Sequence, residues 1–343
     1  MLRQSLPWLP LGSYPTAVEE IRVDGRCVLV KRDDRCAPGY AGNKVRKLEF
    51  LLGAARAAGT RRLITAGATG SHHAFATAYH GRALGFASSL VLFPQRLTAH
   101  VRELLLLDHA VGAELRWVRR MEAVPFGMWR ARVAHRRDRP AVIPPGGSSA
   151  TGSLGYVNAG LELAGQIDDG SAPRPDRIHV AAGTLGTAAG LAVGLAWAGL
   201  PIPVIASRIT SRLVASERAL QALVRRIVEL LASAGADPPD AAAALRLLDL
   251  RHDQFGDGYG RATEQGARAA DLFGAAGLSL DGTYTAKAAA GLLADQTEGL
   301  PLFWHTLSAV APLDLLEDGR NAALPQPFAD YLAAADSVAL PDA

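Results

Sequence analysis

Short apolar runs alternate with alanine- and leucine-rich helical stretches along most of this 343-residue chain. The strand-like runs are Arg26–Val30, Leu63–Thr65, Ser89–Leu92, Ala141–Ile143, Arg177–Ala181, Ile202–Ala206 and Leu302–His305. Alternation of this kind favours parallel sheets flanked by helices, because each parallel strand pair needs a crossover connection. The sequence therefore predicts an α/β fold. Residues 208–249 are predicted to be helical, with a break at 236–239.

Length and composition fit a globular protein with a large core. Hydrophobic residues make up 49% of the chain and charged residues 20%, and the net charge is +3. Only Trp117 and Trp129 lie near the arginine-rich stretches, too few aromatic residues for a nucleic-acid stacking platform. Cys27 and Cys36 form no zinc motif or disulfide framework, and neither a signal pattern nor a membrane-length apolar run is seen. We expect a cytoplasmic protein that binds neither nucleic acid nor membrane.

Lysine is rare in this chain. Four lysines stand against 32 arginines, which suggests that a retained lysine does something arginine cannot, such as losing its proton to form an imine. Lys44 is the candidate, because it follows a Gly42–Asn43 turn and precedes an apolar helical run. Two solvated lysines, Lys44 and Lys47, at the start of a helix would also explain the pattern.

A strand, a Gly/Thr loop and a small-residue helix follow one another at residues 178–195. Gly183 and Gly186 allow a sharp turn, Thr184 and Thr187 offer hydroxyls, and the free N–H groups at a helix start attract anions. The loop matches neither the nucleoside-triphosphate motif nor the dinucleotide fingerprint. An imine-forming lysine together with a phosphate-binding loop indicates pyridoxal phosphate as the cofactor.

Six ordered segments give the chain a family resemblance. They are GNKVRKLEF (42–50), TAGATGSHHAFATA (65–78), PPGGSSATGSLGYVNAGLEL (144–163), AGTLGT (182–187), GDGYG (256–260) and DGTYTAKAAAGL (281–292). The chain resembles the pyridoxal-phosphate enzymes of the tryptophan synthase β-like fold (fold type II). Within them it is similar to the group containing D-cysteine desulfhydrase and 1-aminocyclopropane-1-carboxylate deaminase.

The resemblance implies a two-lobed fold and a set of site residues. A small lobe of residues 53–155 would be inserted into a large, discontinuous lobe of residues 1–52 and 156–343, with the cofactor between them, in a homodimer. The implied cofactor-binding residues are Asn43, Lys44, His72, Gly183, Thr184, Leu185, Gly186, Thr187, Thr285 and Thr306. The implied catalytic residues are Lys44, Ser71, Tyr259 and Tyr284, and the implied substrate-binding residues are Ser71, His72, His73, Tyr259 and Tyr284.

Each implied role has a structural alternative. Ser71 would receive the substrate carboxylate, although a serine at a helix start is also an ordinary N-cap. Tyr259 and Tyr284 would donate or accept a proton on the substrate side, although aromatic packing explains them too. His72 and His73 with His80 do not have the arrangement of a metal site, so no metal is expected.

Departures from the family pattern bear on the substrate. His72 stands where the family has an asparagine beside the cofactor's phenolic oxygen, and Leu185 replaces a glycine of the phosphate loop. Leu307 and Ser308 replace two further glycines. These changes suggest an altered substrate or, alternatively, a non-catalytic homologue that only carries the cofactor.

Two threonines bear on the type of reaction that is catalysed. In this family, ring-opening deaminases have a glutamate and a leucine where this chain has Thr285 and Thr306, whereas the desulfhydrases have hydroxyl residues. A neutral hydroxyl near the pyridine nitrogen leaves the ring a weaker electron sink, which suits β-elimination. We therefore expect a lyase that converts D-cysteine or a related β-substituted amino acid to pyruvate, ammonia and the leaving group. Ring opening to 2-oxobutyrate and β-replacement remain alternatives.

Overall fold

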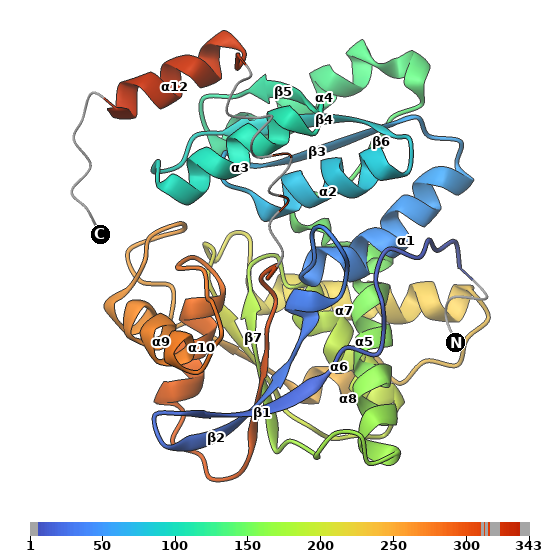
Figure 1. The fold of residues 1–343 in the computed structure, drawn as a ribbon. Coiled ribbons are helices and arrows are strands. Elements are labelled where there is room, and N and C mark those ends of the chain that lie inside the picture. The colour runs from blue at the N-terminus through green and yellow to red at the C-terminus, as the bar shows by residue number, and fades with distance from the viewer. Residues whose placement is uncertain (1–5, 310–311, 313–314, 316–322, 337–343) are drawn as a thin grey trace. The chain divides into compact units, whose positions relative to one another are not determined.

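The computed structural model describes residues 6–309, 312, 315 and 323–336 (Figure 1). The chain divides into two compact units, residues 1–51 with 147–310 and residues 52–146 with 311–343. Helix α1 (Asn43–Ala57) begins in the first unit and ends in the second.

The larger unit is built on a six-stranded sheet in the order β1-β2-β10-β7-β8-β9. Its strands are β1 (Val18–Val23), β2 (Arg26–Lys31), β7 (Arg177–Ala182), β8 (Val204–Arg208), β9 (Leu248–Arg251) and β10 (Pro301–Trp304). Strands β1 and β2 pair antiparallel around the two-residue turn Asp24–Gly25, whose residues both have positive φ, a preference of Asp-Gly hairpin turns. The other neighbouring strands pair in parallel.

Helices cover both faces of this sheet. The helices are α5 (Ala150–Asp168), α6 (Gly186–Trp197), α7 (Glu217–Ser233), α8 (Ala241–Arg246), α9 (Glu264–Ala275) and α10 (Thr285–Ala294). One buried apolar cluster joins β7, β8 and β10 to α5, α6, α7 and α8, and another joins β2, β7 and β10 to α9 and α10. Helices α5 and α6 approach closely, since a Cβ at Gly194 would lie 2.3 Å from the Val157 carbonyl oxygen. This contact explains why the α6 sequence is rich in small residues.

The smaller unit holds a four-stranded parallel sheet in the order β5-β4-β3-β6. Its strands are β3 (Arg62–Ala68), β4 (Ala87–Phe93), β5 (Glu114–Trp117) and β6 (Ala141–Val142), and its helices are α2 (His72–Ala83), α3 (Ala99–Ala110), α4 (Val124–Ala134) and α12 (Gln326–Asp336). Short 3-10 helices in the described residues are Asp33–Arg35, Met121–Ala123, Arg136–Asp138 and Pro145–Gly147. Helix α12 packs in this unit through an edge-to-face contact of Phe328 with Trp117.

All seven predicted strand regions contain strands, but three strands were missed. These are β1, β5 and β9. Prediction of residues 208–249 as helical was wrong at both ends, because Arg208 ends β8 and Leu248–Arg251 forms β9. The alternating Leu248, Asp249, Leu250 and Arg251 form a strand because they pair with β8 at the sheet edge.

The two compact units differ from the predicted lobes at Leu52, at residues 147–155 and at residues 311–343. Residues 150–155 belong to α5, which packs on α6 in the larger unit, so the smaller unit stops at Gly146 rather than at residue 155. The C-terminal helix α12 groups with the smaller unit, through contacts such as that of Tyr331 with the Gln95 carbonyl.

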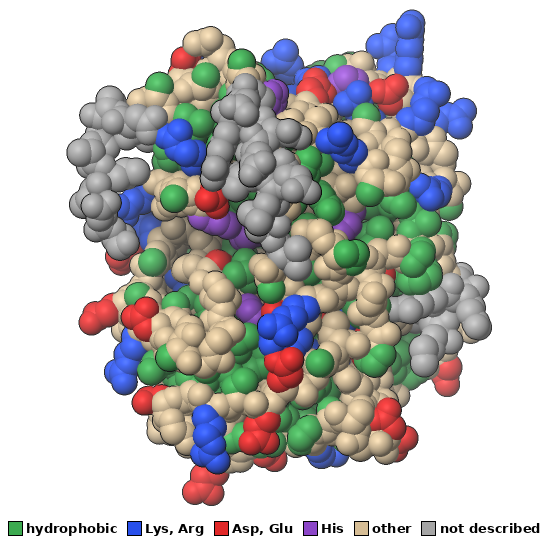
Figure 2. Space-filling view, viewed as in Figure 1, with side chains coloured by type: hydrophobic (Ala, Val, Ile, Leu, Met, Phe, Trp, Pro, Cys, Tyr) green, Lys and Arg blue, Asp and Glu red, His purple; other side chains and the backbone are tan. Residues whose placement is uncertain are grey.

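The surface is mixed in charge. Figure 2 shows basic side chains lying among acidic and hydrophobic ones on one face, as a net charge of +3 would suggest. Among the described residues, no helix has both the length and the apolar character needed to cross a membrane.

Candidate active site

The segment before Lys44 is held by the chain that follows β10. Gly42 has a φ of +88°, and a Cβ there would lie 2.7 Å from the Thr306 carbonyl oxygen. That carbonyl accepts a hydrogen bond from the Asn43 N–H at 3.1 Å. The Ser308 hydroxyl accepts one from the Ala41 N–H at 2.9 Å. Thr306 and Ser308 therefore fix the start of α1.

Lys44 is the first candidate nucleophile. Its amine donates to the Asn43 side-chain oxygen at 2.6 Å and lies 5.9 Å from the centre of the Tyr284 ring. Burial lowers the pKa of Lys44 to about 8, against the opposing effect of the Asp281 carboxylate. About 9% of such amines are neutral at pH 7, roughly 300-fold more than for an ordinary lysine. This is the state that an imine-forming lysine needs.

The other three lysines have different surroundings. Lys31 pairs with Glu162 at 2.7 Å. The Lys287 amine donates to the Phe255 carbonyl oxygen at 2.8 Å. Lys47, three residues after Lys44, donates to the Ser148 hydroxyl at 3.2 Å. Burial, followed by the charge of Lys44, lowers the pKa of Lys47 well below its usual value.

The Gly/Thr loop joins β7 to α6, as the sequence predicts. Helix α6 begins at Gly186, and its N-cap residue Leu185 has no capping side chain, so the N–H groups that follow Gly186 in the first turn suit an anion. The Gly183 carbonyl is held by the Thr210 hydroxyl at 2.6 Å. The Ser148 hydroxyl accepts from the Gly186 N–H at 3.2 Å and lies 2.6 Å from the Thr184 hydroxyl.

Asn43 joins the lysine to this loop, because its side-chain amide donates to the Thr187 hydroxyl at 3.3 Å. Residues separated by more than 130 positions thus form one group. We call the set of Asn43, Lys44, Ser148, Thr184, Gly186 and Thr187 the lysine loop cluster. All its members belong to the larger unit.

Leu185 occupies an unusual backbone conformation within the loop. It precedes α6 with φ 68° and ψ −21°, the left-handed region that favours glycine. Its side chain is nevertheless buried in the apolar cluster under α5 and α6. The loop therefore has a backbone conformation typical of glycine at a leucine. Burial of the leucine side chain offsets the strain of that conformation.

The two predicted tyrosines lie together. The Tyr259 and Tyr284 hydroxyl oxygens are 2.5 Å apart. Burial raises the pKa of each, and for Tyr284 the neighbouring Tyr259 raises it further, so both hydroxyls stay protonated near neutral pH. A Cβ at Gly183 would lie 3.1 Å from the Tyr284 ring, which places this pair beside the loop.

Thr285 and Thr306 differ in their roles. The Thr285 hydroxyl donates to the Asp281 carboxylate at 2.7 Å and accepts from the Asp281 N–H at 2.8 Å. Asp281 also accepts from the N–H groups of Thr283 and Tyr284, which fixes the start of α10. Thr306 contributes its backbone carbonyl to the start of α1, as described above.

Ser71, His72 and His73 lie at the start of α2 in the smaller unit. The Ser71 hydroxyl accepts from the Ala74 N–H at 3.2 Å, so it caps the helix. The His72 Nε2 lies 3.0 Å from the Nε2 of His100, a residue that the sequence did not single out. His73 is buried, with its Nε2 3.0 Å from the Thr65 hydroxyl. Their predicted roles toward a ligand stay predictions.

The lysine loop cluster suits pyridoxal phosphate. A partly neutral lysine lies beside an uncapped helix start rich in hydroxyls. The Ser153 hydroxyl is buried without a hydrogen-bond partner among the described residues, 3.0 Å from where a Cβ at Gly186 would lie. An unsatisfied polar atom behind a glycine loop fits a site that receives a polar group.

Comparison with known proteins defines the class. Residues 8–300 match the family described as pyridoxal-phosphate dependent enzyme, and the chain belongs to this family. A nocardicin C-9' epimerase from Nocardia uniformis subsp. tsuyamanensis is 39% identical over 320 residues, which cover 88% of this chain and 93% of the relative. A D-cysteine desulfhydrase from Klebsiella pneumoniae (strain 342) is 36% identical over 326 residues, covering 89% and 95%.

A solved structure described as an ACC deaminase homologue has the same fold. Its TM-score is 0.77 at 31% identity, covering 92% of this chain and 98% of that chain. The predicted family, fold class and cofactor are thereby confirmed.

Sequence reasoning missed several residues of the site. Ser148 and Asp281 lie within segments that carried the resemblance, but only their contacts show their roles. Ser148 links the loop to Lys47, and Asp281 binds the Thr285 hydroxyl. Ser153 also lies in a segment that carried the resemblance, whereas Thr210 had no local signal, since it acts through the Gly183 carbonyl.

Proposed function

We propose that this protein is a pyridoxal-phosphate-dependent amino-acid lyase that catalyses β-elimination, with D-cysteine or a related β-substituted amino acid as substrate. The observation that carries the proposal is the Lys44 amine, with a pKa of about 8, beside the protonated Tyr259–Tyr284 pair. The similarity to D-cysteine desulfhydrase supports the substrate class.

The bound cofactor withdraws electrons and makes the Cα hydrogen of an amino acid acidic. In our proposal, the Asn43, Ser148, Thr184 and Thr187 side chains and the first N–H groups of α6 hold the cofactor. The neutral Lys44 Nζ takes the Cα proton. The bond from Cβ to the leaving group then breaks, its electron pair leaves with that group, and the Tyr284 hydroxyl supplies a proton. Hydrolysis of the remaining three-carbon fragment gives pyruvate and ammonia.

Ser71, His72 and His73 are proposed to serve the substrate. Ser71 already caps α2, so the same helix start offers N–H groups to a carboxylate. We expect Ser71→Ala to raise KM more than it lowers kcat, and Ser71→Thr to restore much of the loss because it keeps the hydroxyl.

A second candidate is epimerisation at Cα. The relative that is 39% identical is named an epimerase, and removal of the Cα proton is common to both reactions. The two reactions then differ, because epimerisation returns a proton to the opposite face of Cα and keeps the β-substituent. Ring opening of 1-aminocyclopropane-1-carboxylate is a third outcome, supported by the solved ACC deaminase homologue.

One set of incubations separates these reactions. The holoenzyme is given D-cysteine, L-cysteine, D-serine and the cyclopropane amino acid in D2O, while pyruvate, 2-oxobutyrate, ammonia and Cα deuterium are followed. We expect pyruvate and ammonia in equal amounts from a β-substituted substrate. Deuterium exchange with inversion and no pyruvate would establish an epimerase instead, and faster formation of 2-oxobutyrate would establish a deaminase.

We further propose a cytoplasmic homodimer. Helix α4 carries exposed apolar side chains, with Phe126 60% and Trp129 59% exposed and their rings stacked 5.7 Å apart. Such a patch suits burial by a second copy. Light scattering is expected to give twice the chain mass of 36.0 kDa, and Trp129→Lys to shift it toward the monomer.

A further inference from the structure

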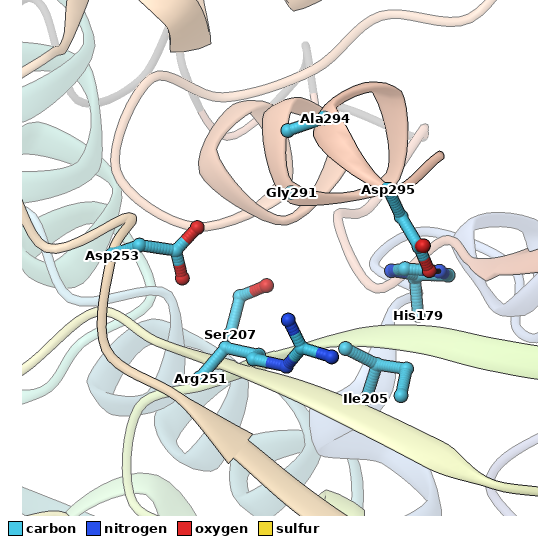
Figure 3. A pocket seen from close by; sticks show the side chains of 8 residues that line it. All are labelled: His179, Ile205, Ser207, Arg251, Asp253, Gly291, Ala294 and Asp295. Carbon is cyan, nitrogen blue, oxygen red and sulfur yellow. Dashed lines mark ion pairs between the residues drawn. The ribbon is translucent and has the colours of Figure 1, made fainter. Parts of the chain in front are cut away.

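A small cavity lies between the sheet of the larger unit and the C-terminal end of α10 (Figure 3). Gly291 and Asp295 line it from the side of α10, and His179, Ser207 and Arg251 line it from β7, β8 and β9. Thr285 of the candidate active site stands at the other end of α10, about 9 Å along the helix axis from Gly291. None of the residues assigned above to the lysine loop cluster lines this cavity.

The floor of the cavity carries buried polar atoms without a well-formed hydrogen bond to any described residue. Ser207 is 1% exposed, and its hydroxyl has no hydrogen-bond partner among the described residues. His179 is fully buried, and neither of its ring nitrogens makes a well-formed hydrogen bond within those residues, although Nε2 lies 3.2 Å from the Asp295 carboxylate. A buried hydroxyl without a hydrogen-bond partner lowers the stability of the fold by about 1–3 kcal/mol, and a polar ligand on this floor would supply the missing partner.

The mouth of the cavity carries charges of both signs. The Nε of Arg251 binds Asp249 at 2.6 Å, while no hydrogen bond is found for its two terminal nitrogens among the described residues. Figure 3 shows the Ser207 and Arg251 side chains turned toward the space between the sheet and α10, with Asp253 on one side and Asp295 on the other. Asp295 already binds Arg177 at 2.8 Å, whereas the hydrogen bond of the Asp253 carboxylate within the described part of the chain is to the Gln254 amide, at 2.8 Å.

Size and charge together limit the ligand. The free volume of about 70 Å³ is several times the 10–15 Å³ that one water needs, so a molecule of about five or six non-hydrogen atoms fits. A simple anion would face the carboxylates of Asp253 and Asp295, and a simple cation would face the Arg251 guanidinium. A molecule that carries both charges satisfies both sides.

We propose that this cavity is a second, non-catalytic binding site for a small zwitterionic amino acid. Its carboxylate would accept hydrogen bonds from Arg251 and Ser207, and its ammonium group would donate to Asp253. The proposal does not depend on which reaction the enzyme catalyses.

Calorimetric titration with glycine tests the proposal. The holoenzyme is first reduced with borohydride, which fixes the cofactor to its lysine so that the amino acid cannot react there. We expect glycine to bind with one-to-one stoichiometry, and acetate and methylammonium, which each carry one of its charges, to bind at least tenfold more weakly. Absence of glycine binding, or acetate binding as tightly as glycine, would overturn the proposal.

A pair of glycine variants locates the site. A Cβ at Gly291 would lie 2.8 Å from the Ser207 hydroxyl, so Gly291→Ala fills the cavity. Gly274→Ala is the control, because it is also helical and a Cβ there meets nothing within 4 Å. Alanine favours helix at both positions, so neither change should unfold the protein. We expect Gly291→Ala to weaken glycine binding at least tenfold and Gly274→Ala to leave it unchanged, whereas equal affinities would place the binding elsewhere.

Two further variants test the contacts. Ser207→Ala and Arg251→Gln should each weaken glycine binding at least fivefold. Because the Ser207 hydroxyl has no hydrogen-bond partner in the described part of the chain, Ser207→Ala should not lower the melting temperature of the ligand-free enzyme. Unchanged glycine affinity in both variants would contradict the assignment of the carboxylate to these two residues.

Discussion

Helix α1 carries side chains into two polar regions of the larger unit that differ in how completely their charges are paired. Lys44 belongs to the lysine loop cluster. Arg46, two residues on, belongs to a group that we call the buried charge cluster, defined by Lys31, Asp33, Arg46 and Glu162. Arg46 binds Asp33 at 2.7 Å and Glu162 at 2.8 Å, and Lys31 completes the pairing of Glu162.

Neutral side chains donate further hydrogen bonds to the buried charge cluster. Asp33 also accepts from the Tyr156 hydroxyl at 2.8 Å and from the Trp304 indole at 2.7 Å. Burial opposes the charge on Glu162, but Arg46 and Lys31 outweigh it and lower the pKa of Glu162 to about 2. Glu162 therefore stays charged near neutral pH, and the contacts of the cluster hold α1, α5 and β10 together.

The lysine loop cluster has the opposite character. No carboxylate hydrogen-bonds to the Lys44 amine among the described residues, and burial lowers its pKa to about 8. The comparison shows that burial alone does not make a lysine reactive. Lys31 is fully buried but has Glu162 as a partner, whereas Lys44 is partly buried and has a neutral amide.

The largest expected effect separates Lys44 from Lys47. Lys44→Ala should abolish the visible absorption of bound cofactor and lower kcat at least a thousandfold, because the covalent link and the base are lost together. Lys47→Ala should keep the visible band, since it removes a contact to Ser148 and leaves the Lys44 amine in place. Absorption spectra and borohydride reduction followed by peptide mapping check this. A borohydride-reducible cofactor link in Lys44→Ala would reject the assignment.

The next effect concerns the buried charge cluster. Arg46→Leu should lower the free energy of unfolding by about 3–5 kcal/mol, because it leaves the buried charges of Asp33 and Glu162 without their main partner. The exposed Arg225 on α7 is the matched control, for which Arg225→Leu should change stability by about 0.5 kcal/mol or less. Urea denaturation measures both. A loss below about 1 kcal/mol for Arg46→Leu would mean that the cluster does not stabilise the unit as argued.

The sequence alone predicted the main parts of the lysine loop cluster but not the buried charge cluster. Lys44 and the loop at Gly183–Thr187 could be singled out because a rare lysine and a strand–glycine–helix pattern are local signals, and the structure joins them through Asn43. The buried charge cluster left no such signal, since both of its pairs with Glu162 link residues more than 100 positions apart, as in the contact of Arg46 with Glu162. Strand β9 was missed for the same reason, because its partner β8 lies some 40 residues earlier.

A smaller effect concerns pH. Only the neutral amine attacks an aldehyde, so uptake of pyridoxal phosphate by the apoenzyme should accelerate as pH rises through the Lys44 pKa of about 8. Between pH 7 and pH 9 the neutral fraction rises about tenfold and then levels off, whereas that of an ordinary lysine rises about a hundredfold and continues to rise. Stopped-flow measurement of the visible band gives the profile. A rate that still climbs in proportion to hydroxide at pH 10 would show that Lys44 is not shifted.

The smallest effect concerns Leu185, where the lysine loop cluster meets the core. Removing this buried side chain should destabilise the protein in either Leu185→Ala or Leu185→Gly, because both leave a cavity under α6. Alanine keeps the strain of a φ of 68°, while glycine adopts that φ freely. We therefore expect Leu185→Gly to be more stable than Leu185→Ala by about 1 kcal/mol, the reverse of the usual order within helices. Paired urea denaturation of the apoenzymes measures the difference. If Leu185→Ala proves the more stable of the two, the left-handed conformation at this position is not a source of strain. A residue with a side chain would then adopt a φ of 68° there without cost, and packing would not be needed to offset it.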